Sequence, residues 1–129
     1  MTSPRIPISW GELFDKITIL EIKLKKLKAK AALANVDNEF KQLNKIYREQ
    51  FEASVEASQL KGELKEINQR LWTIEDQIRD KEKNKVFDDE FIQLARSVYV
   101  TNDERSRIKR RINEAFDSDL VEEKSYADY

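Results

Sequence analysis

The sequence predicts an all-α protein, an antiparallel helical bundle of about four long helices with coiled-coil-like seams. The 129 residues include only two glycines and two prolines, and both prolines lie before residue 8. Chains that form β-sheets need many more turn residues than this. Charged residues make up 38% of the chain and hydrophobic residues 40%, a balance typical of long helices with narrow apolar stripes. The apolar residues recur in steps of three and four, which is the period of a helix.

The first predicted helix begins after Ser9. Ser9 and Glu12 have the spacing of a capping box, and Ile8 and Leu13 have that of a hydrophobic staple. The apolar residues that follow alternate steps of four and three, as in a coiled-coil seam. This seam comprises Leu13, Ile17, Leu20, Leu24, Leu27 and Ala31.

The second predicted helix follows a polar cluster at residues 35–38, with Asp37 as its N-cap. Its end is open, because the segment after it contains no proline and only Gly62. A break near residues 54–58 and one continuous helix over 37–84 both fit the sequence, but a change of register in the seam favours a break. The apolar side of this helix is formed by Val36, Phe40, Leu43, Tyr47 and Phe51.

The third predicted helix spans residues 58–84 and would be about 40 Å long at 1.5 Å per residue. Its seam is regular, and a second row with alternating aromatic and charged side chains runs beside it on a neighbouring face. The seam comprises Leu60, Leu64, Ile67, Leu71, Ile74 and Ile78, and the second row Asn68, Trp72, Glu75, Arg79 and Glu82.

The fourth predicted helix begins after Asp88, the candidate N-cap. Asp89 and Glu90 complement the positive end of its dipole, and Phe87 has the spacing to staple onto Ile92. Polar residues interrupt the apolar seam of this helix. The seam comprises Phe91, Leu94 or Ala95, Val98, Ile108, Ile112 and Phe116, and the polar positions on it are Asn102, Arg105 and Lys109.

The polar positions in the fourth helix predict an interhelical ionic network. If the second row of the third helix faces them, Glu75 and Glu82 can pair with Arg105 and Lys109, with Asn102 between them. Partly buried ion pairs and a single asparagine often determine helix register, and they need no ligand. The first interpretation is therefore structural.

Two alternatives remain open. Arg79, Arg105 and Lys109 could form a pocket for a small anion, or the helix could restart at Thr101, which forms a second capping box with Glu104. Under the pocket interpretation the candidate ligand-binding residues are Trp72, Glu75, Arg79, Glu82, Asn102, Arg105 and Lys109.

The composition argues against most kinds of enzyme. The chain has no histidine and no cysteine, so it lacks the usual general base, the cysteine nucleophile and the commonest metal ligands. Two glycines cannot form a phosphate-binding loop of the known kinds. We therefore expect no catalytic residue, no metal and no cofactor. A non-covalent isomerase would survive this filter, because it needs only cations and a shaped pocket.

The same composition gives expectations about partners and location. The net charge is −1, and the lysine-rich run at residues 23–30 has no aromatic residues among its lysines, so we do not expect nucleic acid as a partner. A membrane-spanning helix needs about 18 consecutive apolar residues, and no apolar run in the sequence approaches this length. No signal peptide is visible. We expect a cytoplasmic homodimer, with a protein partner as the other option, because narrow seams leave apolar surface uncovered. The chain is expected to form one domain over 1–129, with an extended segment at 1–8 and an acidic tail at 117–129.

Three phrases of the sequence resemble an uncharacterised bacterial family of short helical proteins: PISWGELFDKITILEIK at 7–23, LWTIEDQIR at 71–79 and VEEKSYADY at 121–129. The resemblance implies a shared fold and brings no activity. The chain has Asp117 where the resemblance leads us to expect a glycine before the tail. The phrase LWTIEDQIRDKE also has a faint likeness to the opening helix of the all-helical chorismate mutases, from which no residue role carries over.

Overall fold

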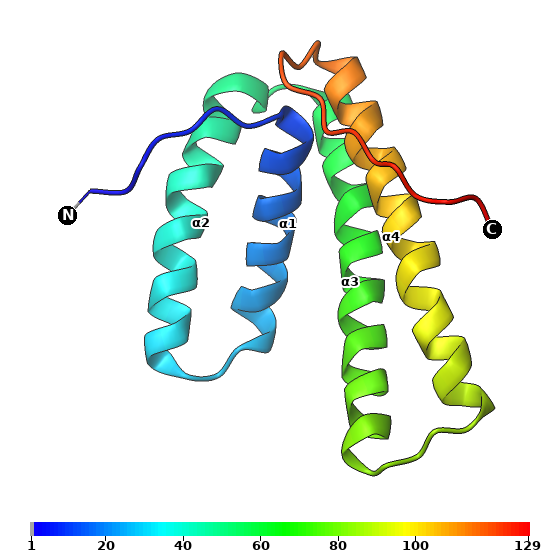
Figure 1. The fold of residues 1–129 in the computed structure, drawn as a ribbon. Helices are drawn as coiled ribbons and strands as arrows, with labels where there is room; N and C mark the ends of the chain where they lie inside the picture. Colours follow the sequence, from blue (N-terminus) through cyan, green and yellow to red (C-terminus); the bar gives the residue numbers. More distant parts are fainter. Residues whose placement is uncertain (1) are drawn as a thin grey trace.

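The chain folds as two helical hairpins in a computed structural model that describes residues 2–129. Residue 1 of the predicted extended segment lies outside this range. The central helix is α1, which packs against each of the other three. Figure 1 shows the two hairpins joined at one end and diverging toward the other. An all-α bundle is confirmed, with the elements α1 (Trp10–Lys26), α2 (Lys30–Phe51), α3 (Val55–Lys83) and α4 (Asp89–Ala115).

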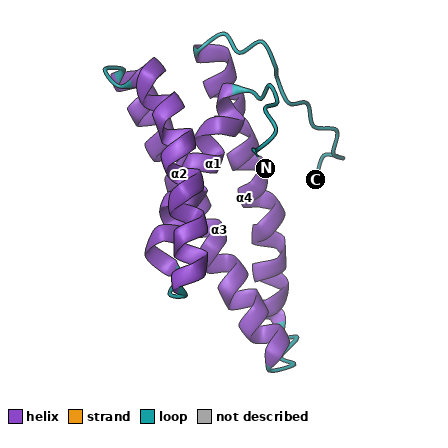
Figure 2. Cartoon of the chain, turned by 90° about the vertical axis from the view of Figure 1, so that its left-hand side faces the viewer, coloured by secondary structure: helices purple, strands orange, loops and turns teal. Residues whose placement is uncertain are grey.

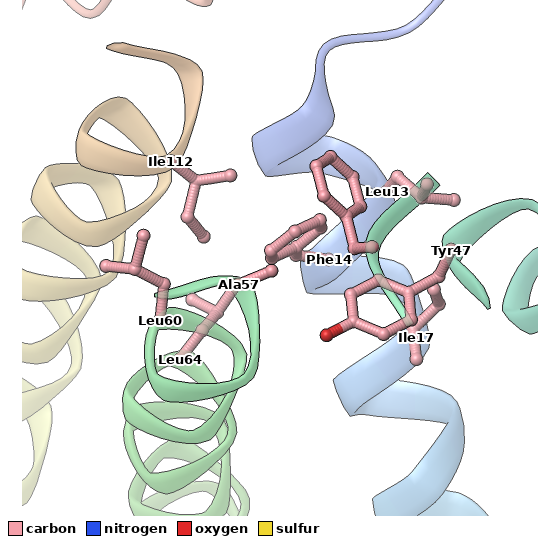
Figure 3. Packing of buried hydrophobic residues seen from close by; sticks show 9 residues of the cluster. Leu13, Phe14, Ile17, Tyr47, Ala57, Leu60, Leu64 and Ile112 are labelled. Atoms are coloured by element: carbon pink, nitrogen blue, oxygen red, sulfur yellow. The ribbon is translucent and has the colours of Figure 1, made fainter. Parts of the chain in front are cut away.

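The hydrophobic core lies at the joined end of the hairpins, which we call the closed end. Phe14 of α1 is fully buried there, with its ring centroid 5.2 Å from that of Tyr47 and 5.3 Å from that of Phe51. Figure 3 shows side chains from this cluster pointing toward one another. Edge-to-face aromatic pairs of this kind add to the stabilisation that comes from burial alone. The cluster comprises Leu13, Phe14, Ile17, Tyr47, Phe51, Ala57, Leu60, Leu64 and Ile112.

The second half of α3 and the first half of α4 form a two-helix extension, which we call the open arm (residues 69–100). Figures 1 and 2 both show it reaching past the turn between α1 and α2. No residue of the open arm is buried, because each of its helices is covered mainly by the other. Its half-buried seam comprises Leu71, Ile74, Ile78, Phe91, Leu94 and Val98.

The turn between α1 and α2 lies at residues 27–29, so the predicted division at 35–38 is wrong. Asp37 lies inside α2, where it pairs with Lys41 at 2.8 Å, and does not cap a helix. Ala29 precedes α2 without any side-chain cap. The earlier turn makes Val36 part of α2, where it is buried. Packing between the helices therefore outweighs the local capping signal.

The other helix boundaries follow the sequence more closely. The favoured break before α3 is confirmed, since Ser54 caps that helix and accepts a hydrogen bond from a backbone N–H at 3.1 Å. The proposed restart of the last helix is wrong, because α4 runs without interruption through Thr101, which is buried. Asp88 does cap α4, and the rings of Phe87 and Phe91 meet edge to face with centroids 5.2 Å apart. The predicted staple of Phe87 onto Ile92 stays a prediction.

Both α3 and α4 end in Schellman turns with a residue other than glycine in the left-handed conformation. Lys85 has φ 55° after α3, and Asp117 has φ 50° after α4. In the second turn the Ser118 N–H donates to the Asn113 carbonyl at 2.8 Å. Asp117 thus adopts the conformation that a glycine would favour at this position.

Candidate functional site

The start of α1 is held against the end of α4 by side-chain caps. The Gly11 N–H donates to Asn113 Oδ1 at 2.7 Å, and the Trp10 N–H donates to Ser118 Oγ at 3.2 Å. These bonds satisfy N-terminal amides that a helix cannot satisfy by itself. Gly11 also permits the close approach, because a Cβ atom there would lie 2.6 Å from the Lys109 carbonyl oxygen. The contact directs the first turns of α1 toward the cationic side chains of α4.

Asp15 of α1 is the buried centre of an ionic network, with 2% of its surface exposed. Arg105 donates two hydrogen bonds to its carboxylate, from Nε at 3.0 Å and from Nη2. Asn68 Nδ2 donates a further hydrogen bond to the same carboxylate at 2.9 Å. Burial would raise the pKa of Asp15, but the hydrogen bonds from Arg105 and Asn68 and the charge of Lys109 outweigh it and lower that pKa. Asp15 is therefore held as a carboxylate.

Lys109 of α4 joins a second acidic residue of α1 to this network. Its Nζ lies 2.9 Å from Glu12, 3.6 Å from Asp15 and 3.2 Å from Glu122 of the C-terminal tail. Burial would lower the pKa of Lys109, but these three carboxylates raise it instead. We call Glu12, Asp15, Arg105 and Lys109 the ion cluster.

Polar side chains complete the surroundings of Asp15. Asn68 Nδ2 also donates to Thr18 Oγ1 at 3.0 Å, and the Thr18 hydroxyl donates to the Asp15 carbonyl at 2.9 Å. Arg105 Nη1 is directed toward Asn102 Oδ1 at 3.4 Å. The network therefore ties α1, α3 and α4 together, with its buried polar atoms hydrogen-bonded as a buried network requires.

The predicted bases, Arg105 and Lys109, do belong to an ionic network, but the predicted acids, Glu75 and Glu82, do not. Glu75 pairs with Arg79 of its own helix at 3.2 Å, and Glu82 pairs with Lys85 at 3.7 Å. Arg105 instead binds a carboxylate of α1, because α1 packs against both α3 and α4 and presents Asp15 to them.

The predicted ligand-binding residues divide between two cavities on either side of Arg105. A groove of about 480 Å³ lies between α1, α3 and α4, and a cavity of about 620 Å³ lies between α4 and the C-terminal tail. Glu82 lines neither of them. The groove is lined by Trp72, Glu75, Arg79, Asn102 and Arg105, and the cavity by Asn102, Arg105 and Lys109, together with residues that had not been predicted.

The acidic residues of the ion cluster were not identified in the sequence. Glu12 had been assigned to a capping box, and Asp15 lies off the seam that the apolar residues define. A signal was present, since Glu12, Asp15 and Thr18 recur every three residues along one side of the first helix. Glu122 could not be found in this way, because the tail has no periodic pattern.

The ion cluster is balanced in charge, with two acids and two bases on the helices. Such an arrangement holds helices in register and pairs both Arg105 and Lys109 with carboxylates of α1. Among residues 2–129, no group of three or more potential ligand side chains is placed to hold a metal ion. No helix in that range is long and apolar enough to cross a membrane.

Comparison with known proteins identifies the family and nothing finer. A search of curated proteins and a search of solved structures each returned no match. No finding supports the likeness to chorismate mutases. One family model matches almost the whole length, residues 4–129, and confirms the resemblance to an uncharacterised family. The chain therefore belongs to DUF6165, a family of unknown function.

Proposed function

We propose that the protein is a non-enzymatic binding module that forms a homodimer through its open arm. The observation that carries this proposal is that none of the residues 69–100 is buried, although an apolar seam runs along both helices. At the closed end α1 covers the same seam of α3, where Leu60, Leu64 and Ile67 are buried. A second open arm would supply two helices of the same kind and complete a four-helix bundle.

Charge is compatible with this pairing. The open arm carries six basic and seven acidic residues, so two copies meet without net repulsion. The corresponding part of the first hairpin, residues 19–46, carries seven basic and three acidic residues, and two copies of it would repel each other. The open arm is therefore the part of the chain better suited to a self-complementary contact.

The alternative of a small-anion site or non-covalent isomerase between the third and fourth helices has less support. Its three cations do not share a cavity, because Arg79 lines the groove and Lys109 lines the cavity beneath the tail. Arg105 lines both, but its guanidinium already binds Asp15. We therefore favour the binding module.

Sedimentation velocity over a range of concentrations tests the proposal. We expect the wild-type protein to sediment as a species of twice the 15.3 kDa of one chain. The variant Ile92→Glu places a charge on a side chain of the open arm that is 50% exposed, and it should yield monomer with unchanged helical content. Ile46→Glu is the matched control, since Ile46 is 46% exposed on α2, outside the arm.

Two results would contradict the proposal. One is a wild-type protein that stays monomeric at about 1 mM, where an association worth about 4 kcal/mol already gives half-saturation. The other is a dimer that Ile46→Glu disrupts and Ile92→Glu leaves intact, because the contact would then lie on the first hairpin.

A further inference from the structure

The C-terminal tail, residues 119–129, runs back along α4 (Figures 1 and 2). Side-chain contacts hold it there. Glu123 pairs with Arg110 at 2.9 Å, the Tyr129 hydroxyl donates to Asp103, and the Tyr129 and Tyr99 ring centroids lie 5.2 Å apart. Every residue of this segment is exposed, and none makes a backbone-to-backbone hydrogen bond. Contacts of this kind are individually weak, so the tail can exchange its partners at low cost.

The cavity beneath the tail has the size and lining of a small-molecule site. Its volume of about 620 Å³ falls within the range of about 300–1,000 Å³ that is usual for ligand pockets. Tyr99 and Tyr126 provide aromatic surface, and Ser106 and Asn102 provide hydrogen-bonding groups. The groove between α1, α3 and α4 shares Asn102 and Arg105 with this cavity, but its apolar residues lie on α1 and α3.

A carboxylate of the tail indicates where an anion is held at this site. Glu122 bridges two lysines of the cavity lining, with Oε2 at 3.2 Å from Lys109 and Oε1 at 2.5 Å from Lys124. Lys109 also has Glu12 and Asp15 as partners, so the helices remain balanced when the tail moves. Removing Glu122 from this bridge would leave Lys124 without a counter-charge and Lys109 with room for another anion.

We propose that this cavity binds a small organic anion with an aromatic ring, whose acidic group replaces the Glu122 carboxylate between Lys109 and Lys124. The ring packs against Tyr99 and Tyr126. The Glu122 carboxylate occupies the anion position when no ligand is bound, so this one side chain competes with the ligand while Lys124 and Tyr126 of the tail stay in the site. The cavity shares Val98 and Tyr99 with the open arm, and the proposal does not rest on dimer formation.

The test follows the backbone amide signals of the wild-type protein by NMR during titration with phenyl phosphate. A fragment of this size binds in the millimolar range, so the titration extends to about 10 mM. We expect saturable shifts at residues 98–109 and 124–127, and weaker binding of phenol and of inorganic phosphate. No saturable shift, or shifts confined to residues 71–79, would overturn the proposal.

Variants of two neighbouring glutamates separate competition from a general charge effect. Glu122→Gln removes the competing anion and should tighten phenyl phosphate binding about fivefold, whereas Glu123→Gln, which removes the neighbouring pair with Arg110, should leave it unchanged. Lys124→Met and Tyr126→Ala should each weaken binding about fivefold. All four side chains are exposed, so the fold is retained. Equal affinities for the wild type and Glu122→Gln would overturn the competition.

Discussion

The closed end and the open arm are built from the same two helices and differ in what covers them. On α3, Leu64 and Leu71 are one heptad apart, yet Leu64 is fully buried and Leu71 is half-buried. Ion pairs divide in the same way, since the Asp15–Arg105 pair is largely buried and Glu75–Arg79 is exposed. The repeat of apolar residues makes a helix amphipathic, but the presence of α1 decides which part of the stripe on α3 becomes a core.

The largest difference between the two regions should come from their ion pairs. Asp15→Ala removes the carboxylate that Arg105 binds and should reduce the free energy of unfolding by about 3–5 kcal/mol, the usual cost of breaking a buried pair. Glu75→Ala in the open arm should reduce it by about 0–1 kcal/mol. Urea denaturation of both variants measures the contrast. A loss below about 1 kcal/mol for Asp15→Ala would mean that the ion cluster is exposed to solvent.

Acid should weaken the closed end through the same carboxylate. The pKa of Asp15 is lowered in the folded protein from its ordinary value of 3.8, so its contribution to stability is present above that value and is lost as the pH falls through the folded-state pKa. We expect the free energy of unfolding to fall more steeply below pH 3.8 for the wild type than for Asp15→Asn. Parallel pH profiles for the two proteins would show that Asp15 has the same pKa in both states.

Replacing Leu64 and Leu71 with alanine tests how much the packing of α1 on α3 contributes to the free energy of unfolding. Leu64→Ala should cost about 2–5 kcal/mol, because it leaves a cavity in a packed core. Leu71→Ala should cost about 1 kcal/mol in the monomer, because its side chain is only half-buried. Thermal unfolding at several protein concentrations measures both losses. If the open arm dimerises, the loss for Leu71→Ala grows with concentration, while that for Leu64→Ala does not.

The contrast between the regions also explains which features could be predicted from the sequence. Helix starts with side-chain caps at Ser9, Ser54 and Asp88 depend on local chemistry, and the sequence contains that information. The turn at 27–29 has no cap residues, so only the packing of α1 on α2 determines its place. The acids that Arg105 binds depend on which helix lies in the middle, a property of the tertiary arrangement.

The two glycines of the chain should respond in opposite directions to the same substitution. Gly11→Ala places a Cβ 2.6 Å from the Lys109 carbonyl oxygen, so α1 and α4 must move apart at a cost of about 1–3 kcal/mol. Gly62→Ala meets no atom within 4 Å and should stabilise α3 by about 1 kcal/mol. Chemical denaturation distinguishes the two. A neutral Gly11→Ala would show that the contact between α1 and α4 at the closed end is loose.

The smallest changes in stability should come from the two residues with left-handed backbone conformation that end α3 and α4. Lys85→Gly, at the tip of the open arm, should raise stability by about 1 kcal/mol, because lysine has no compensation for a φ of 55°. Asp117→Gly, at the closed end, should raise it less, because aspartate tolerates this conformation better. Differential scanning calorimetry resolves both changes. The gain at Lys85 reaches the global transition only if the open arm unfolds together with the core, so a Lys85→Gly variant with an unchanged melting temperature would identify the arm as a separate unfolding unit.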